Sequence, residues 1–393
     1  MARALTPLTE EQKEVQAMAR EFAARELAPF AAAWDRDAYF ERSLVGKLGA
    51  AGLLGMMIPE EFDGLGLDTL TYLIALEEIA AVDASTAVTM SVHNSLPTQM
   101  LMRWGSDDQK QRFLKPMARG DILGAFALSE PESGSDASSL RTQAVRDGDH
   151  WVLNGTKAWV SSGSHAGVIL AMARTDGGSD RRGARGVSAF ILTPDCPGFS
   201  VGKKEDKMGL RASPTVEIRL DDCRVPHANM LGELGMGFIY AMQSLDAGRL
   251  GIAAQAVGIA QAALTHASHY AAERRQFGHP IKEFQAVQFM LADMSVRVAA
   301  SRSLLHAAAT ARDRGQEMTQ FSAMAKLMAS ETAMWVTTQA IQIFGGYGYV
   351  KDYPVERLFR DAKVTEIYEG TSEIQRIVIA RALYSHDGRP HAR

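Results

Sequence analysis

The chain has 393 residues, more than one hydrophobic core usually organises, so two or three domains are expected. Apolar residues make up 46% of the sequence and charged residues 22%, as in an ordinary soluble globular protein. The net charge of −4 lacks the basic signature of a nucleic-acid-binding protein.

The first part of the chain, residues 8–120, is predicted to be helical. Apolar side chains recur at helical spacing near its start, at Val15, Met18, Ala19 and Phe22. A second helix is predicted over residues 70–81, after Asp68 and Thr69. A further helix is predicted over residues 86–104, ending near Gly105.

From residue 122 the pattern changes to short apolar runs separated by Gly, Asp, Ser and Pro. Strands are predicted over residues 122–128, 168–173, 187–193 and 215–220. Asn154-Gly155 lies between two strand-like flanks in residues 151–160, which predicts a β-hairpin. The spacing predicts an antiparallel barrel or sandwich, and residues 176–186, with Arg181 and Arg182, are predicted to form an exposed loop.

From Gly237 onward helices return. Residues 237–273, 284–313 and 318–343 are predicted as three long helices, the material of a bundle, and the polar tail from Asp387 is expected to fray. The fold class is therefore α+β, with an N-terminal α-helical domain (1–121), a middle antiparallel β domain (122–235) and a C-terminal four-helix bundle (236–393). No G-x-G-x-x-G follows a strand and no Walker-type loop is present, which argues against the usual nicotinamide or ATP site.

The cysteines, the amino-terminal residues and the apolar runs bear on the compartment. Cys196 and Cys223 are far apart and have no CxxC or histidine partner pattern, so neither a zinc site nor a disulfide framework is expected. The first residues contain no apolar signal core, and acidic side chains follow at once. No apolar run is expected to span a bilayer. The expected location is the cytoplasm, with no metal and no membrane partner.

The segment IYEGTSEIQR, residues 367–376, is predicted to be a tight turn that leads into a helix. Thr371 and Ser372 are cap-type residues, and Ile374, Ile377 and Val378 follow at helical spacing. Glu369 is then directed off the helix, and Gly370 permits a close approach of the main chain. Such a carboxylate is either a general base or an ordinary solvated turn glutamate.

Five other segments allow both a binding and a structural interpretation. The loop LSEPESGSD exposes N–H groups and hydroxyls after a strand, and Trp159 with Ser161 offers an aromatic wall or a core tryptophan. ERRQFG ends a helix either with a phosphate contact from Arg274 or with simple capping. GGYGY ends another helix in a glycine-rich loop. Gly248 in the helical segment LDAGRL costs about 1 kcal/mol relative to alanine, so a packing or access reason is expected.

Taken together, these segments resemble the acyl-CoA dehydrogenase family over nearly the whole chain. The motifs that carry the resemblance are LSEPESGSD (128–136), WVSSG (159–163), ERRQFG (273–278), QIFGGYGYV (342–350) and IYEGTSEIQR (367–376). The family is a three-domain flavoenzyme that holds FAD between the β domain and the C-terminal helices. The order of helices, strands and helices predicted above agrees with it.

The resemblance assigns roles to residues of this chain. Cofactor contacts within one subunit are implied for Phe126, Leu128, Ser129, Gly134, Ser135, Trp159, Ser161, Thr371 and Glu373. Contacts to the FAD of a neighbouring subunit are implied for Arg274, Gln276, Phe277, Gln285, Gln342, Ile343, Gly345 and Gly346. Substrate contacts are implied for Ser135, Asp246, Arg249 and Gly370. Glu369 becomes the catalytic base that takes the C2 proton while the flavin accepts hydride from C3.

Two differences from other members of the family narrow the choice of catalytic base and the class of acyl-CoA substrate. Some relatives carry the base near position 248, where this chain has Gly248, so only Glu369 can serve. Gly248 in its segment, with MSVHNSL at 90–96, is most similar to the short-chain branch that takes butyryl-CoA. Relatives that take glutaryl-CoA have an arginine near the start of the 87–100 helix, where Ala87 stands here, so a dicarboxylyl substrate is not expected.

The resemblance also implies partners and pathways. Electrons would pass to an electron-transfer flavoprotein, and the enzyme would be a homotetramer, a dimer of dimers, in fatty acid β-oxidation or branched-chain amino acid degradation. One alternative is an acyl-CoA oxidase. Oxidases of this kind usually carry an additional C-terminal domain. Others are a non-catalytic nucleic-acid-associated flavoprotein of the same fold, or a purely structural helical protein.

Overall fold

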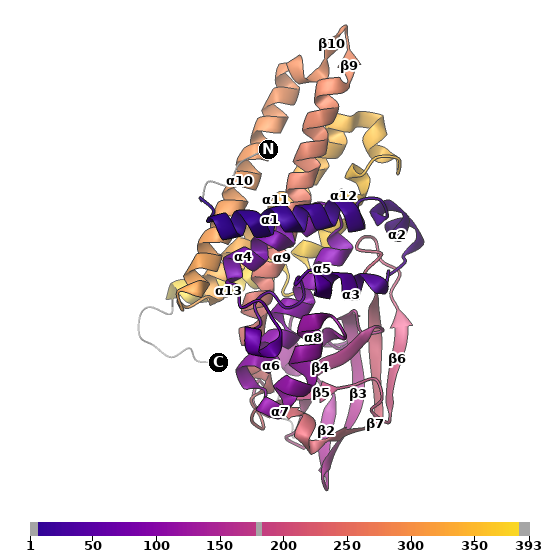
Figure 1. Ribbon diagram of the computed structural model, residues 1–393, viewed down its shortest axis with the longest axis vertical. Coiled ribbons are helices and arrows are strands. Elements are labelled where there is room, and N and C mark those ends of the chain that lie inside the picture. Colours follow the sequence, from indigo (N-terminus) through magenta and orange to yellow (C-terminus); the bar gives the residue numbers. More distant parts are fainter. Residues whose placement is uncertain (1–6, 178–182, 385–393) are drawn as a thin grey trace.

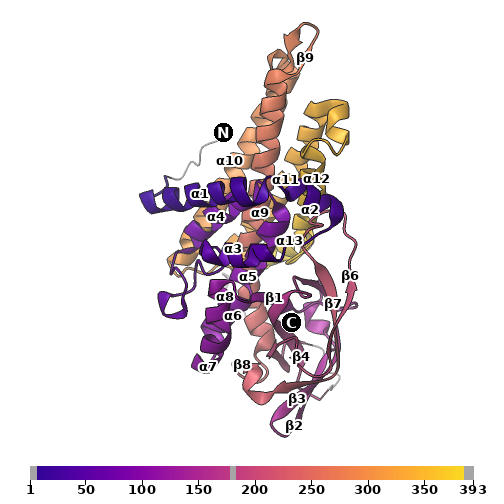
Figure 2. The same ribbon diagram turned by 45° about the vertical axis from the view of Figure 1, so that its right-hand side comes forward.

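The structure is a computed structural model that describes residues 7–177 and 183–384. Helices of the first part lie between a β-sheet at one end of the molecule and long C-terminal helices that extend to the other end (Figures 1 and 2). This order confirms the predicted α+β fold, while the domain limits at 121/122 and 235/236 stay a prediction. Arg181, Arg182 and the tail from Asp387 lie outside the described residues.

Several of the N-terminal helices begin at capping side chains. Their bounds are α1 (Glu10–Phe22), α2 (Ala31–Asp37), α3 (Ser43–Ala50), α4 (Thr69–Ala80), α5 (Ala84–Ser95), α6 (Pro97–Trp104), α7 (Asp107–Gln109) and α8 (Lys115–Arg119). Thr9 forms a capping box at α1, and the Asp68 side chain accepts from the Thr71 N–H at α4. Ala19 and Phe22 are buried in the core, as their spacing predicts.

The prediction of a single helix over residues 86–104 is wrong, because the helix is interrupted at Leu96, between α5 and α6. Pro97 has no N–H to donate, and its ring disfavours helical geometry at the preceding residue. Leu96 accordingly has φ −111° and ψ −78°. The break brings Leu96 close to α9, at the site described below.

The middle part forms one eight-stranded sheet. Its strands are β1 (Leu123–Ala127), β2 (Gln143–Asp147), β3 (His150–Ser161), β4 (Ala166–Arg174), β5 (Val187–Leu192), β6 (Phe199–Lys204), β7 (Thr215–Pro226) and β8 (Met230–Leu231). The order is β6-β7-β3-β2-β4-β5-β8, with β1 also paired to β4. Most pairings are antiparallel, as predicted, whereas β1 and β2 run parallel to β4.

The hairpin predicted at Asn154-Gly155 is wrong. β3 runs through both residues, and the turn lies earlier, between β2 and β3, where Gly148 has φ 62°. The register of β3 against β7 shifts between Leu153 and Gly155, which marks a bulge. The Asn154 side chain fixes it by donating to Asp222 Oδ1 and accepting from the Asp222 N–H, at 3.0 and 2.8 Å.

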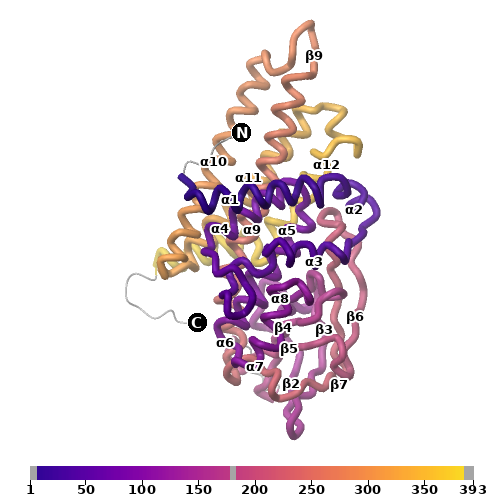
Figure 3. The backbone as a smooth tube through the Cα atoms, in the orientation of Figure 1, coloured from indigo at the N-terminus to yellow at the C-terminus, as the bar shows by residue number. Residues whose placement is uncertain are grey.

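The C-terminal part confirms the three predicted long helices. Its elements are α9 (Gly237–Glu273), β9 (Arg275–Gln276), β10 (His279–Pro280), α10 (Gln285–Asp313), α11 (Thr319–Phe344), α12 (Val355–Lys363) and α13 (Ser372–Tyr384). α9 has 37 residues and packs against α4, α5, α10 and α11, and the chain trace in Figure 3 follows it to the β9–β10 tip.

α9 corrects the expectation that no apolar run could span a bilayer. By length and composition alone it is long and apolar enough to do so. However, 83% of its apolar window is buried inside the protein, where it serves as the central helix of the core.

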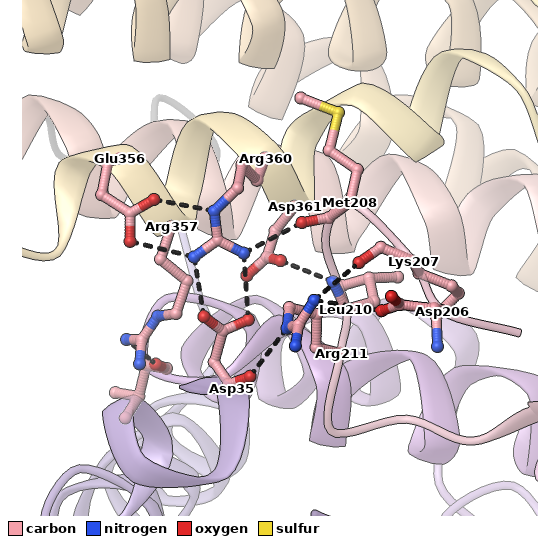
Figure 4. Close-up of polar contacts among 11 residues, drawn as sticks. Asp35, Asp206, Lys207, Met208, Leu210, Arg211, Glu356, Arg357, Arg360 and Asp361 are labelled. Carbon is pink, nitrogen blue, oxygen red and sulfur yellow. Dashed lines mark hydrogen bonds and ion pairs between the residues drawn. The ribbon is translucent and has the colours of Figure 1, made fainter. Parts of the chain in front are cut away.

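All three parts of the chain meet at a charged junction (Figure 4). Arg360 of α12 donates to both carboxylate oxygens of Asp35 on α2, at 3.1 and 2.7 Å, and also to Glu356 and the Met208 carbonyl. The neighbouring Asp361 accepts from the Leu210 N–H at 2.6 Å. The junction therefore ties α2 and the loop before β7 to the helix that leads toward Glu369.

We expect Asp361→Asn to change how stability depends on pH. Burial raises the pKa of Asp361 to about 7, and the charges of Asp35 and Asp83 add to the rise, against the Leu210 N–H and Arg357. Because the folded state keeps this proton up to about pH 7 while the unfolded state releases it near 4, stability should fall with rising pH by up to about 1.4 kcal/mol per unit in that window. The melting temperature of the variant minus that of the wild type should therefore be higher at pH 8 than at pH 5. A difference in melting temperature that stays constant with pH would contradict this expectation.

Candidate active site

Glu369 lies on a strained turn at the start of α13. Its φ is +53°, and Gly370 follows with φ +93°. The Tyr368 N–H donates to the Val364 carbonyl before the turn, and the Thr371 hydroxyl accepts from the Ile374 N–H after it, at 3.3 Å. A positive φ is uncommon for a residue with a side chain and is found where surrounding contacts impose it, often at functional sites. The predicted tight turn before a capped helix is confirmed.

The Glu369 side chain is directed into the protein. Both carboxylate oxygens are buried, and neither has a hydrogen-bond partner among the residues that the structure describes. This excludes the alternative of an ordinary solvated turn glutamate. A buried carboxylate without partners is costly, so such a group calls for a functional explanation.

Gly248 of α9 lies directly against this carboxylate. A Cβ atom at position 248 would lie 2.9 Å from the Glu369 carboxylate carbon and closer still to Oε2, with Leu96 Cδ2 at 3.1 Å. The packing reason expected for this mid-helix glycine is therefore the space that the Glu369 side chain occupies.

Two cations face the Glu369 carboxylate from different helices. Burial raises the pKa of Glu369 to about 7, and the charges of Lys326 and Arg249 oppose that rise. Arg249 is buried and donates to Asp246 Oδ1 at 2.6 Å, while Asp246 Oδ2 accepts from the Thr319 hydroxyl at 2.9 Å. A carboxylate with a pKa near neutrality suits general-base catalysis at physiological pH.

Sequence reasoning missed the residues that hold this turn. Lys326 of α11 donates to the Gly370 carbonyl at 2.7 Å. Gln375 of α13 donates to the carbonyls of Glu369 and Gly370, at 3.2 and 2.8 Å, and the Tyr368 hydroxyl donates to Gln255. The available signal was a lone cation in the apolar run AMAKLMA around Lys326.

The loop after β1 is anchored to β3 by a buried ion pair. Lys157 has no exposed surface and donates to Glu130 at 2.7 Å and to the Leu128 carbonyl at 3.2 Å, while Ser129 accepts from the Ala158 N–H. Phe126 packs against the helical cores, and Leu128 is buried. Gly134 and Ser135 are exposed, so the loop presents its main chain and hydroxyls outward, as predicted.

Trp159 lies next to this loop on β3. Its φ is +60°, the register of β3 against β7 shifts between Lys157 and Val160, and its side chain is 64% exposed. The alternative of a core tryptophan is therefore wrong. Ser161 is half-buried two residues further on, at the end of the strand.

A second group of predicted residues gathers at the far end of α9. Together with Tyr270 and Tyr347, five of the predicted residues line an open groove of about 860 Å³. These five are Arg274, Gln276, Ile343, Gly345 and Gly346. The Arg274 guanidinium lies 5.4 Å from the Tyr347 ring centre. Phe277, in the β9–β10 turn, is 90% exposed, Gln285 begins α10, and Gln342 is exposed near the end of α11.

The groove is remote from Glu369 within one chain. At 1.5 Å per residue, the part of α9 from Gly248 to its end at Glu273 is about 38 Å long. The structure therefore brings Gly248, Arg249 and Asp246 to Glu369 and keeps Arg274 and Gln276 away from it. No cluster of His, Cys, Asp and Glu suited to a metal ion occurs in residues 7–177 and 183–384.

The comparisons with known proteins agree with this arrangement. The N-terminal, middle and C-terminal domain families of acyl-CoA dehydrogenases match residues 9–121, 125–223 and 235–384. The chain belongs to the acyl-CoA dehydrogenase family. It is an enzyme of that family, whose members are FAD flavoproteins, and FAD is its cofactor.

One curated protein and two solved structures illustrate how similar other proteins are to this chain. The mitochondrial short-chain specific acyl-CoA dehydrogenase of Mus musculus is 51% identical over 373 residues, 95% of this chain and 90% of that protein. The butyryl-CoA dehydrogenase of Megasphaera elsdenii has a TM-score of 0.94 at 44% identity, covering 96% of this chain and 99% of the other. A structure described with the electron transferring flavoprotein of Acidaminococcus fermentans has a TM-score of 0.94 at 48% identity, with coverage of 96% and 99%.

The described residues of this acyl-CoA dehydrogenase fit FAD in two places. The exposed hydroxyl-bearing loop at Gly134 and Ser135, with exposed Trp159, offers polar contacts and an aromatic wall. The groove at Gly345 and Gly346 is open, since a Cβ at either glycine would meet no atom within 4 Å. Arg274 supplies a cation there, which suits a phosphate group.

Proposed function

We propose that this enzyme dehydrogenates a short-chain acyl-CoA, such as butyryl-CoA, to the trans-2-enoyl-CoA, with Glu369 as the base. One observation carries the proposal: a buried carboxylate without a hydrogen-bond partner faces a glycine on a helix that also carries a buried arginine. The names of the relatives from Mus musculus and Megasphaera elsdenii support the short acyl chain.

Glu369 takes the C2 proton of the acyl thioester. The C2–H bond is a weak acid, so the base must be dry, close and ionised when substrate binds. Burial excludes water from the carboxylate, and the cations Lys326 and Arg249 favour its ionised form. FAD, when bound, accepts the hydrogen that leaves C3 with its electron pair.

We assign contacts to the thioester or the CoA part of the substrate to Asp246, Arg249 and Gly370. Asp246 and Arg249 form a largely buried ion pair on either side of Gly248, and Gly370 directly follows the base. These residues orient C2 toward Glu369, and correct orientation of bound groups is one of the largest contributions to catalysis.

We assign FAD contacts within one subunit to the loop at 128–135, Trp159, Ser161, Thr371 and Glu373. The groove lined by Arg274 and Gly345 takes part of the FAD of a neighbouring subunit, because it is about 38 Å from Gly248 along α9. The active assembly is then a homo-oligomer, and a homotetramer agrees with the family pattern.

We further propose an electron-transfer flavoprotein as the electron acceptor and fatty acid β-oxidation as the pathway. The similarity to the structure described with such a flavoprotein supports the acceptor. A branched acyl-CoA from amino acid degradation is the second candidate class of substrate, to be compared with the straight short-chain acyl-CoA.

The test is anaerobic reduction of the bound flavin. The purified protein should carry yellow FAD that bleaches with butyryl-CoA faster than with octanoyl-CoA, isobutyryl-CoA or glutaryl-CoA, ranked by kcat/KM. Flavin that stays oxidised with every acyl-CoA would reject the proposal. Oxygen consumption during turnover that matches product formation would replace the electron-transfer flavoprotein by oxygen as acceptor.

A further inference from the structure

Lys326 is a buried cation whose hydrogen bond to the Gly370 carbonyl is not explained by the proposed reaction. It lies in the first third of α11, and its side chain has no exposed surface. Burying an ammonium group costs free energy unless it is paired or hydrogen-bonded, so a lysine in this position requires a compensating role. Burial lowers the pKa of Lys326 to about 8, which leaves it mainly protonated at neutral pH.

The hydrogen bond of Lys326 is made to the turn that carries the base. Its Nζ donates to the Gly370 carbonyl at 2.7 Å, and Gln375 Nε2 donates to the same oxygen at 2.8 Å. The turn, with φ +53° at Glu369, is thus held from α11 on one side and from α13 on the other. Since the Gly370 carbonyl follows the base by one residue, its position fixes where the Glu369 side chain begins.

The charge of Lys326 also acts on the Glu369 carboxylate. The groups that face Glu369 are Lys326 from α11, Arg249 from α9, Tyr72 from α4 and Tyr368 from its own turn. Only the first two are cationic, and Arg249 is already engaged by Asp246. Besides Glu369, the acidic groups Glu366 and Glu373 also act on Lys326, and more weakly.

We propose that Lys326 is a positioning residue for the base: its ammonium group holds the Gly370 carbonyl, one residue after Glu369, and its charge keeps the buried carboxylate ionised. The inference rests on the proposed function, because it assigns Lys326 to the proton-abstraction step. Lys326 touches the main chain of the turn and is not itself assigned a contact with the substrate.

The test is to titrate Glu369 in variants of Lys326. Protein labelled with ¹³C at the glutamate side-chain carboxyl gives an NMR signal for Glu369 that is identified by its loss in Glu369→Gln. In Lys326→Met the midpoint of this titration should move up by about one pH unit or more, because an opposite charge near the carboxylate is lost. The acid limb of flavin reduction by butyryl-CoA should move by the same amount. In Lys326→Arg, which keeps the charge, both midpoints should stay near the wild-type value.

Lys207→Met is the matched control. Lys207 also donates to a carbonyl, that of Ser213 at 2.7 Å, and burial also lowers the pKa of Lys207 to about 8, but it lies in the loop before β7. This variant should leave the Glu369 midpoint unchanged. If Lys326→Met does not fold, Lys326→Gln, which keeps a donor without the charge, should give the same upward shift.

An unchanged midpoint in a folded, uncharged Lys326 variant would overturn the inference, as would an equal shift in Lys326→Arg. Failure of the proposed function is visible separately, as wild-type flavin that no acyl-CoA reduces.

Discussion

Glu369→Gln is expected to keep FAD and lose flavin reduction by butyryl-CoA, by about 10³-fold or more. Glutamine has nearly the same shape as glutamate but cannot accept the C2 proton, and general-base groups typically contribute 10²–10⁴-fold. Retained yellow colour with no bleaching would separate lost chemistry from lost cofactor binding. Stopped-flow spectroscopy of the anaerobic reduction measures the effect.

The same variant should be more stable than the wild type above pH 7. The pKa of Glu369 is raised by burial from 4.5 to about 7, so between these two pH values the folded state keeps a proton that the unfolded state releases. Stability is therefore lost as pH rises through this range, by up to about 3 kcal/mol, and glutamine removes that loss. Glu366→Gln is the control, since Glu366 lies three residues earlier and pairs with Lys363. An active Glu369→Gln variant would remove Glu369 from its role.

Gly248→Ala is expected to reduce flavin reduction by about 10²-fold while leaving the fold intact. The added Cβ would meet the end of the Glu369 side chain, which is flexible and can turn aside at little cost. Stability should not fall, because alanine is the better helix former by about 1 kcal/mol. A base displaced by about 1 Å nevertheless loses most of its rate advantage. Rapid-reaction kinetics and thermal unfolding, measured together, test both expectations.

Gly46→Ala provides the control for Gly248→Ala. Gly46 is also within a helix, α3, but a Cβ there would meet no atom within 4 Å. Both variants should gain similar helix stability, and only Gly248→Ala should slow reduction. Equal rates in the two variants would show that the space at position 248 does not serve the base.

The features predicted well from sequence are those that neighbouring residues determine. The turn at Glu369 follows from Gly370 and the capping residue Thr371, and α9 follows from a long helical apolar pattern. Asn154-Gly155 shows the limit of local patterns. The same dipeptide that favours a hairpin also fits a bulge, and its pairing with Asp222 on β7 decided the outcome.

The chemistry of the site depends on contacts between distant parts of the chain. Lys326 reaches Gly370 from α11, and no local pattern distinguishes it from a surface lysine beyond its apolar neighbours. Cys196 and Cys223 give a second example. Both are free and buried, and Cys196, in the loop between β5 and β6, lies beside Cys223 of β7, although nothing in their spacing indicates it.

The junction at Arg360 has a consequence for genetic variation in this enzyme. Asp361 and Glu369 belong to one short segment, whose upstream end is fastened by Asp35 and by the Leu210 N–H. A change at Asp35, in the first tenth of the polypeptide, would loosen the anchorage of the segment that carries the proposed base, Glu369. In a saturation mutagenesis screen, inactivating substitutions should therefore cluster at α2 as well as around Glu369.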